Sequence, residues 1–198
     1  MAVKINPRNL RGPWAGGFAL DAHTTGSTFL GYNAYGHPEF DTRRSPLGEL
    51  VYRLKNRGDR SSIEPIVETV VTFLNRWNPK VDLIVPVPPS NTARKNQPVI
   101  EVANALSERM RIPICSDCIS KVKNTAQLKD VFDVAKRAEI LADAFSVDQT
   151  KIERRRLLLF DDLFRSGATA SAVAKLLSGP GGASAVYLLT LTQTRKKL

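Results

Sequence analysis

The feature that most constrains the fold of this chain is the stretch 157–169, which has the pattern of a strand, two acids, a loop and the start of a helix. Its first four residues, 157–160, are apolar and follow three arginines, as is typical of a strand buried on both faces. Asp161 and Asp162 come next, where we expect the strand to end, and apolar residues then recur at helical spacing over 170–177. The stretch therefore predicts a strand–loop–helix unit of an α/β fold.

The chemistry of the same stretch suits a phosphorylated sugar. Backbone N–H groups of the loop and the positive end of the following helix can hold a phosphate. The hydroxyls of Ser166 and Thr169 add hydrogen bonds, and Gly167 allows a backbone conformation that a Cβ would block. Asp161 and Asp162 can accept hydrogen bonds from ribose hydroxyls or lie near a bound Mg²⁺. The structural alternative is that the two acids only cap the helix.

The remaining elements predict a mostly parallel sheet flanked by helices, an α/β fold in one domain. From residue 83 onward the expected order is strand 83–88, helix 99–110, a short strand beginning at 112–114, a basic loop over 120–137, strand 144–147, the strand and helix already described, and strand 185–192. Two helices come first: a helix entry and a basic helix over 42–58, and a second helix with an apolar stripe over 61–77. Ser45 and Pro46 fit the N-cap and first turn of the first of them.

The N-terminal part has a different composition and predicts a separate small subdomain. Residues 1–13 read as an irregular basic arm, and 14–41 are rich in Gly, Thr and aromatic residues, with hairpin turns expected at 26–27 and 36–38. We therefore expect two domains: an arm with a β-rich, hood-like subdomain over 1–44, and the α/β domain over 45–198. His23 and His37 are isolated in sequence and are expected to be ordinary surface or hairpin histidines.

Charge and cysteine content limit the partners and the compartment. The formal net charge of +10 favours polyanionic partners, but the basic residues are scattered and lack the interleaved aromatics of single-strand binders. The sequence has no apolar run of about 20 residues and no signal-peptide core, so we expect a cytoplasmic protein without a membrane partner. Cys115 and Cys118 supply only two candidate ligands, and we expect them to bind no structural zinc.

The stretch 157–169 resembles the 5-phosphoribosyl-1-pyrophosphate (PRPP) motif of type I phosphoribosyltransferases. In that motif four apolar residues precede two acids, two further apolar residues and a short phosphate loop. The resemblance is fairly specific, because it needs the strand, the acid pair and the loop in one fixed order.

Further segments in the same order resemble the ComF-like branch of this family. They are 85–88 with Arg94 and 96–97, 121–145, and the Lys-containing segment 50–59. Three departures stand out: the N-terminal four-cysteine zinc module is absent, Ile140 and Asp143 replace the usual Asn and Gly, and Arg165 begins the phosphate loop where Thr is common.

The resemblance implies a role for each matched residue. The implied catalytic residues are Asp161, Asp162, Lys121 and Lys123; the 5-phosphate-binding residues are Arg165, Ser166, Gly167, Ala168 and Thr169; the pyrophosphate-binding residues are Val87, Pro88, Pro89, Ser90 and Arg94. Mg²⁺ is the implied cofactor, held indirectly near Asp161 and Asp162 through ribose hydroxyls or water. The basic segment 121–129 is implied to close over the leaving group.

The implied function is displacement of pyrophosphate from PRPP by a nitrogenous acceptor, in nucleotide metabolism. Two alternatives stay open: a catalytically silent PRPP-sensing or regulatory module, and a nucleic-acid-associated protein of DNA uptake or processing. Arg165 stands where purine-salvage enzymes of the wider family commonly have an aspartate, which favours an acceptor with negative charge over hypoxanthine or guanine; alternatively, Arg165 only faces solvent. The acceptor itself stays open, as does the oligomeric state, a homodimer included.

Overall fold

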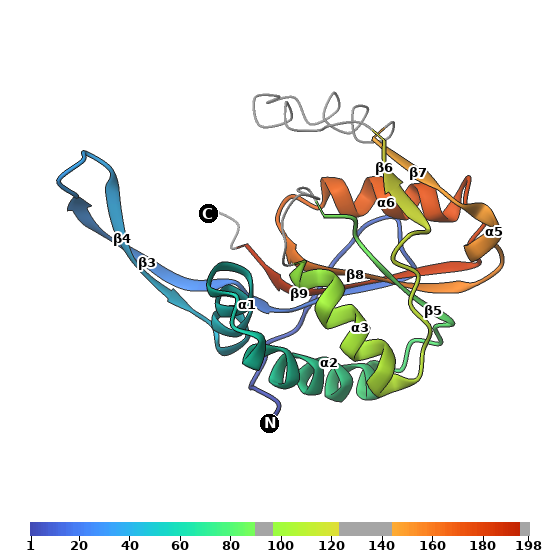
Figure 1. Cartoon of the computed structure of the whole chain (residues 1–198), viewed down its shortest axis with the longest axis horizontal. Coiled ribbons are helices and arrows are strands. Elements are labelled where there is room, and N and C mark those ends of the chain that lie inside the picture. Colours follow the sequence, from blue (N-terminus) through green and yellow to red (C-terminus); the bar gives the residue numbers. More distant parts are fainter. Residues whose placement is uncertain (90–96, 123–143, 195–198) are drawn as a thin grey trace.

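The protein is built on a five-stranded sheet with four parallel strands (Figure 1). In this computed structural model, which describes residues 1–89, 97–122 and 144–194, the strand order is β1-β2-β9-β8-β5. The strands are β1 (Arg8–Asn9), β2 (Gly16–Ala22), β9 (Ala185–Gln193), β8 (Arg156–Phe164) and β5 (Leu83–Pro86). Only β1, at one edge, is antiparallel to its neighbour. The predicted α/β class with a mostly parallel sheet is confirmed.

Helices cover both faces of this sheet, because alternate strand residues point to opposite sides. One face packs against α1 (Pro46–Arg57), α2 (Ile63–Trp77), which follows the short turn η1 (Arg60–Ser62), and α3 (Pro98–Met110). The other face packs against α6 (Ala168–Ser178), the short α5 (Gln149–Ile152) and a two-stranded sheet of β6 (Ile119–Lys121) and β7 (Phe145–Val147). Leu157 and Leu159 lie in the second core, and Leu158 and Phe160 in the first.

The central strand β8 is longer than the sequence predicted. It continues through the acid pair to Phe164, because β9 runs on to Gln193 and keeps offering backbone partners. Asp161 pairs in register with Thr190, and Leu163 with Thr192. The two acids therefore lie within the last part of the strand instead of beyond its end.

The N-terminal segment also differs from the prediction. β2 is a parallel strand of the central sheet, since it carries Ala19 and Leu20 fully buried against the two cores and pairs with β9. The chain then forms a ribbon of β3 (Thr24–Tyr32) and β4 (Pro38–Arg44), whose turn lies at 33–37. The turn predicted at 26–27 is wrong, because these residues lie inside β3. The division into two domains at residues 44 and 45 stays a prediction.

Helix ends follow the expected local chemistry. Ser45 caps α1 by accepting a hydrogen bond from Gly48 N at 2.9 Å, and Gly58 ends the helix in the left-handed region at φ 66°. Asn78 ends α2 in the same conformation at φ 52°. The strand expected at 112–114 is reduced to an isolated parallel bridge between Ile84 and Ile114. None of the helices that the structure describes is long and apolar enough to cross a membrane.

The Ser45 cap gives a test of the fold. Its hydroxyl also donates to Ala22 O at 2.6 Å, so one buried oxygen ties β2 to α1. We expect Ser45→Ala to lower the free energy of unfolding by about 1–3 kcal/mol, through the lost cap and an unsatisfied buried carbonyl. Urea unfolding would measure this, with Ser184→Ala, at an exposed position, as the matched control. A change no larger than that of the control would contradict the assigned role.

Candidate active site

A cavity of about 220 Å³ lies where β5 and β8 end and α3 begins. Parallel α/β sheets bind ligands in this position, outside the carboxyl ends of their strands. The described residues that line the cavity come from α1, the chain after β5, the start of α3, the acid pair of β8 and the first turn of α6. They are Lys55, Val87, Pro88, Pro89, Gln97, Pro98, Val99, Ile100, Asp161, Asp162 and Thr169.

An ion pair joins α1 to the acid pair in the cavity wall. Lys55 Nζ lies 2.5 Å from Asp162 Oδ2, and the side chain of Asp162 is only 11% exposed. A carboxylate this enclosed loses much of its hydration, and the ammonium group of Lys55 offsets part of that cost. Lys55 lies 107 positions before Asp162 in the chain, and only the packing of α1 on the sheet brings the two groups together.

The neighbouring acid is electrostatically different. Asp161 keeps some solvent contact but is surrounded by protein, and this desolvation, with the charge of Asp162, raises the pKa of Asp161 to about 7. Its Oδ1 accepts a hydrogen bond from Asp162 N at 2.8 Å, and this contact and Lys55 oppose the rise only in part. Two adjacent carboxyl groups thus have separate characters: Asp162 is paired, while Asp161 readily gains or loses a proton near neutral pH.

In the loop after β8, Gly167 adopts a backbone conformation that a Cβ would block, as the sequence predicted. Gly167 adopts φ 78° as the residue before α6, and a Cβ there would meet the ring of Phe164 at 2.5 Å. Ala168 N donates to Ser166 Oγ at 3.4 Å, and Thr169 borders the cavity. The N-terminal end of α6, which attracts negative charge, therefore lies beside the acid pair.

Sequence reasoning missed a polar chain that holds the end of β8. Thr192 Oγ1 donates to the backbone oxygen of Asp162 at 3.1 Å and lies 3.1 Å from His23 Nδ1. A hydroxyl has one proton, so Thr192 accepts from His23 in its Nδ1–H form. Burial, Arg44 and Lys55 lower the pKa of His23 below its usual value, although Asp162 opposes them, which favours a neutral ring. The residues around His23 in the sequence give no sign that it contacts Thr192.

Other predicted site residues lie outside the cavity wall. Arg165 and Ser166 are exposed, and neither they nor Gly167 and Ala168 line the cavity. Lys121 belongs to β6, which pairs with β7 in a different sheet, and it does not line the cavity either. Ser90, Arg94 and Lys123 lie outside the described residues. The roles assigned to all of these residues stay predictions.

The pyrophosphate segment needs one correction. Val87 N donates to Phe160 O at 2.8 Å, so the sheet already uses the amide that was expected to bind pyrophosphate. Pro88 and Pro89 have no N–H to offer. The three residues shape the cavity, and donors to a ligand phosphate must come from other groups, with Lys55 the nearest described cation in the wall.

The acid pair fits a magnesium ion that a substrate carries. Within the described ranges no three His, Cys, Asp or Glu side chains gather into a metal cage. Mg²⁺ commonly uses only one or two carboxylates, and takes its other ligands from substrate phosphates and water. Asp161 and Asp162 would be the residues that hold it, directly or through water.

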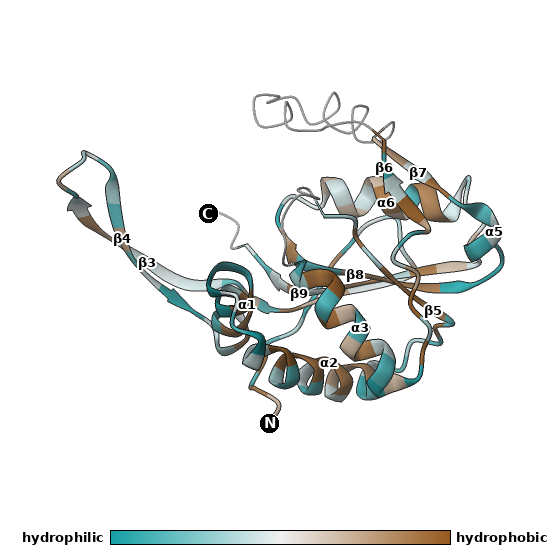
Figure 2. Cartoon of the chain, in the orientation of Figure 1, coloured by the Kyte–Doolittle hydropathy of each residue, from teal (hydrophilic) through white to brown (hydrophobic). Residues whose placement is uncertain are grey.

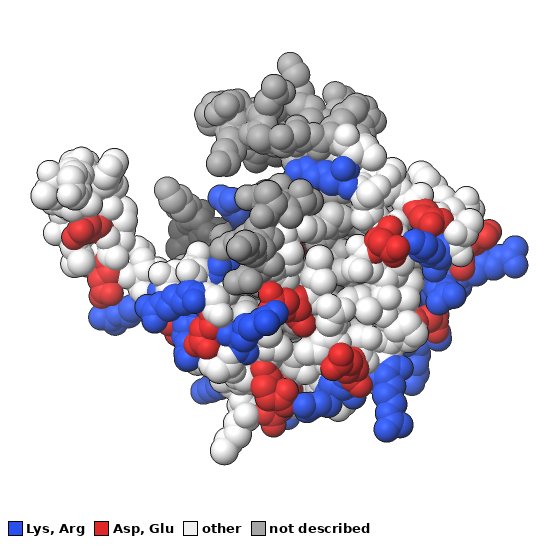
Figure 3. Space-filling model, viewed as in Figure 1, with Lys and Arg blue, Asp and Glu red and all other residues white. Residues whose placement is uncertain are grey.

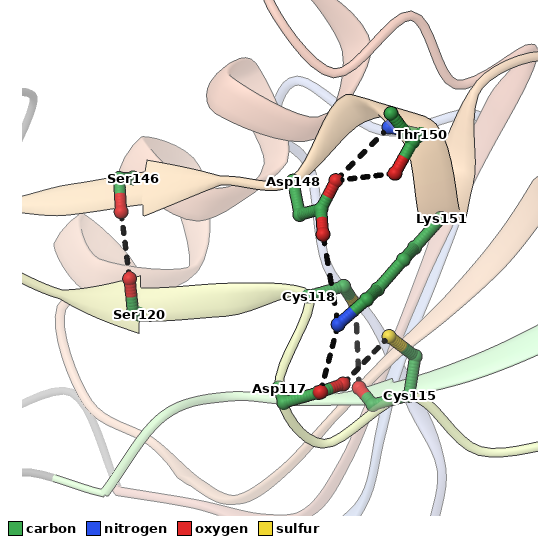
Figure 4. A network of polar contacts seen from close by, with 8 residues as sticks. All are labelled: Cys115, Asp117, Cys118, Ser120, Ser146, Asp148, Thr150 and Lys151. Atoms are coloured by element: carbon green, nitrogen blue, oxygen red, sulfur yellow. Dashed lines mark hydrogen bonds and ion pairs between the residues drawn. The ribbon is translucent and has the colours of Figure 1, made fainter.

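The two cysteines belong to a small polar network away from this cavity (Figure 4). Cys118 Sγ donates to Cys115 O at 3.3 Å, and Cys115 Sγ to Asp117 Oδ1 at 3.5 Å. Lys151 Nζ then bridges Asp117 at 2.7 Å and Asp148 at 3.6 Å, which ties α5 to the chain before β6. Burial raises the pKa of Cys118, so its thiol stays protonated at neutral pH. These contacts assign the cysteines a packing role.

Basic side chains do not form one stripe on the face that Figure 3 shows. Lys and Arg, in blue, are interspersed with Asp and Glu, in red. A phosphate backbone binds best along a continuous basic surface. The view therefore gives no support to a nucleic-acid groove on this face.

No protein-family model and no curated protein matches the chain. Among solved structures, adenine phosphoribosyltransferase from Trypanosoma brucei is 11% identical over 96% of this chain and 87% of that chain, with a TM-score of 0.49. The enzyme of the same name from Leishmania tarentolae is 10% identical over 95% and 94%, also at 0.49. That from Saccharomyces cerevisiae is 10% identical over 83% of each chain, at 0.45. Because these TM-scores are below 0.5, we infer function from this chain's own residues.

The raised pKa of Asp161 predicts a pH-dependent gain in stability for Asp161→Asn. The usual pKa is 3.8 and the folded value about 7, so the unfolded chain releases this proton first. The folded wild type therefore loses stability as pH rises from about 4 to about 7, and the variant does not. We expect the variant to be more stable at pH 8 by on the order of 1–2 kcal/mol, and nearly unchanged at pH 4. Urea unfolding at several pH values measures this.

Asp82→Asn serves as a control, because the pKa of Asp82 is lowered whereas that of Asp161 is raised. Hydrogen bonds from Arg156 lower the pKa of Asp82 to about 2, so its stabilising contribution is present above about pH 4 and is lost only as pH falls toward 2. Its replacement should lower stability by the same amount at pH 5 and pH 8. If the effect of Asp161→Asn were also constant over that range, the assigned environment of Asp161 would be wrong.

Proposed function

We propose that this chain is a phosphoribosyltransferase that binds PRPP with Mg²⁺ and replaces its pyrophosphate with a nitrogenous acceptor. The observation that carries the proposal is the paired Lys55 and Asp162 next to a protonatable Asp161, in a cavity that also reaches Thr169 at the start of α6. A phosphorylated ribose needs an anion site and hydroxyl acceptors a few ångströms apart. The cavity wall has both.

In this proposal the 5-phosphate binds at the N-terminal end of α6, around 165–169, with Thr169 nearest to the cavity. The ribose 2- and 3-hydroxyls donate to Asp161 and Asp162. The pyrophosphate points toward Lys55 and the wall at 87–89. This arrangement places each charged part of the ligand beside a group of suitable charge, and it leaves Arg165, which is exposed, free to meet an acidic acceptor or solvent.

The reaction breaks the bond between C1 of ribose and the pyrophosphate oxygen and forms a bond from C1 to the acceptor nitrogen, whose proton leaves to solvent or to the departing oxygen. Positive charge develops on the ribose ring in between, so the protein's task is to position the groups and to stabilise charge. Asp161 and Asp162 hold the ring by its hydroxyls and lie on the side where that charge appears. Mg²⁺, when bound, neutralises charge on the leaving pyrophosphate.

Asp162→Asn should weaken Mg²⁺-dependent PRPP binding at least tenfold, since the charge-assisted hydrogen bond from a ribose hydroxyl to the Asp162 carboxylate is lost. Isothermal titration calorimetry measures the affinity. Asp117→Asn removes a carboxylate of equal charge far from the cavity and should bind like wild type. Equal affinity in wild type and Asp162→Asn, or no PRPP binding at all, would refute the proposal. Pyrophosphate release with a panel of bases and amines then separates an enzyme from a PRPP sensor.

Binding should also release a proton from Asp161. Hydroxyl donors and Mg²⁺ favour the ionised carboxylate, so the ligand lowers a pKa that starts near 7. Calorimetry at pH 6.5 in two buffers of different ionisation enthalpy counts the protons released. Because PRPP itself titrates, the informative quantity is the difference between wild type and Asp161→Asn, which should be about three-quarters of a proton at this pH. A difference near zero would show that Asp161 does not face the ligand.

A further inference from the structure

The ribbon of β3 and β4 projects from the body as a long arm (Figure 1). It forms its own two-stranded sheet, and neither of its outer edges pairs with another strand in the part of the chain that the structure describes. Two-stranded ribbons are marginally stable alone, and open edges attract other strands. The arm therefore exposes unused backbone donors and acceptors.

The arm is also amphipathic. Five of the seven large hydrophobic residues that are exposed in the described chain lie on it: Phe29, Leu30, Tyr32, Tyr35 and Phe40. Figure 2 shows brown apolar colour in its outer part. Phe29 and Phe40 are register partners with ring centroids 5.5 Å apart, and Tyr32 packs on Phe29 at 5.3 Å. These three rings make an aromatic face that no other described residue covers.

The opposite face of β4 carries charges, because side chains alternate along a strand. Glu39 and Asp41 come first and Arg43 follows two residues later, and all three are exposed. Figure 3 shows the acidic atoms along the arm and basic atoms at its base. Within the described residues no ion pair joins Glu39, Asp41 or Arg43 to another group, although ion pairs are common elsewhere on the surface. Strand β4 is thus acidic at its start and basic at its end.

We propose that β4 pairs antiparallel with β4 of a second copy of this chain, which makes a four-stranded sheet from the two arms. An antiparallel partner presents its basic end to the acidic end of the first strand, so one sequence is complementary to itself, as a two-fold interface requires. A nucleic acid is a poor occupant, since residues 27–42 contain two acids and no Lys or Arg.

Symmetry and charge fix the register. Along an antiparallel strand pair, hydrogen-bonded and non-hydrogen-bonded residue pairs alternate. A two-fold axis between two positions would make two neighbouring pairs identical, which this alternation forbids. The axis must therefore pass through one residue, which lies opposite its own copy. With Asp41 on the axis, two carboxylates would oppose each other. With Thr42 on the axis, each Asp41 lies opposite Arg43 of the other copy. The second register is therefore the one we assign.

Sedimentation equilibrium of the intact chain at 5 and 300 µM tests this, since a short edge interface implies a dissociation constant on the order of 10–100 µM. The average mass should rise from 21.8 kDa toward twice that value. Asp41→Lys and Arg43→Glu should each weaken dimerisation at least tenfold, because each creates two like-charge pairs. The double variant, with the charges exchanged, should return to within threefold of wild type. Lys4→Glu, an exposed charge reversal off the arm, should have no effect.

Thr42→Cys should form a disulfide-linked dimer under mild oxidation, since it faces its own copy across the axis. Thr28→Cys is the matched control: Thr28 is the β3 partner of Asp41 and lies one strand away from the axis. A wild type that stays monomeric at 300 µM would overturn the proposal. The proposal would also be wrong if the double variant Asp41→Lys/Arg43→Glu did not regain the affinity of wild type for itself. Equal cross-linking of Thr42→Cys and Thr28→Cys would contradict it as well. Either result would place the contact between the two copies elsewhere, for example between the tip of the arm and the body.

Discussion

The contact between Lys55 and Asp162 is the interaction on which the rest of the candidate site depends. It requires α1 to lie close to the carboxyl end of the sheet. Gly48 allows this close packing, because a Cβ at that position would lie 2.3 Å from His23 O. Ser45 holds the same corner, with one hydroxyl that bonds β2 and caps α1. A glycine and a serine in the first turn of a helix therefore determine whether a cation reaches the acid pair about two turns later.

The acid pair shows how the site trades stability for chemistry. Two adjacent carboxyl groups in an enclosed position repel each other, and a single Lys55 compensates only one of them fully. The remaining cost falls on Asp161, whose raised pKa records it. This unfavourable repulsion persists only because the surrounding structure fixes the two groups. The hydrogen bonds between β8 and β9 hold the strand, and the hydroxyl of Thr192 donates to the Asp162 carbonyl. Functional sites commonly concentrate groups of this kind.

The sequence predicted features whose causes are local. The apolar run of β8, the Ser45 cap and the Gly167 turn each depend on a few neighbouring residues, and the structure has all of them. The parallel sheet followed from the order of strands and helices. Local patterns could not place β2, because its partners in β9 lie far along the chain: Gly16 pairs with Tyr187. The contacts of Lys55, His23 and Thr192 were missed for the same reason: their partners are distant in sequence.

The arm and the site meet at one short piece of chain. Arg43, whose side chain is available to a second copy, is followed by Arg44, whose guanidinium lies 3.6 Å from the ring centre of Tyr52 on α1 and lowers the pKa of His23. Ser45, the α1 cap, comes next. Strand β4 therefore continues with no linker into the helix that supplies Lys55, and any partner that fixes β4 would also restrict the motion of α1 against the acid pair.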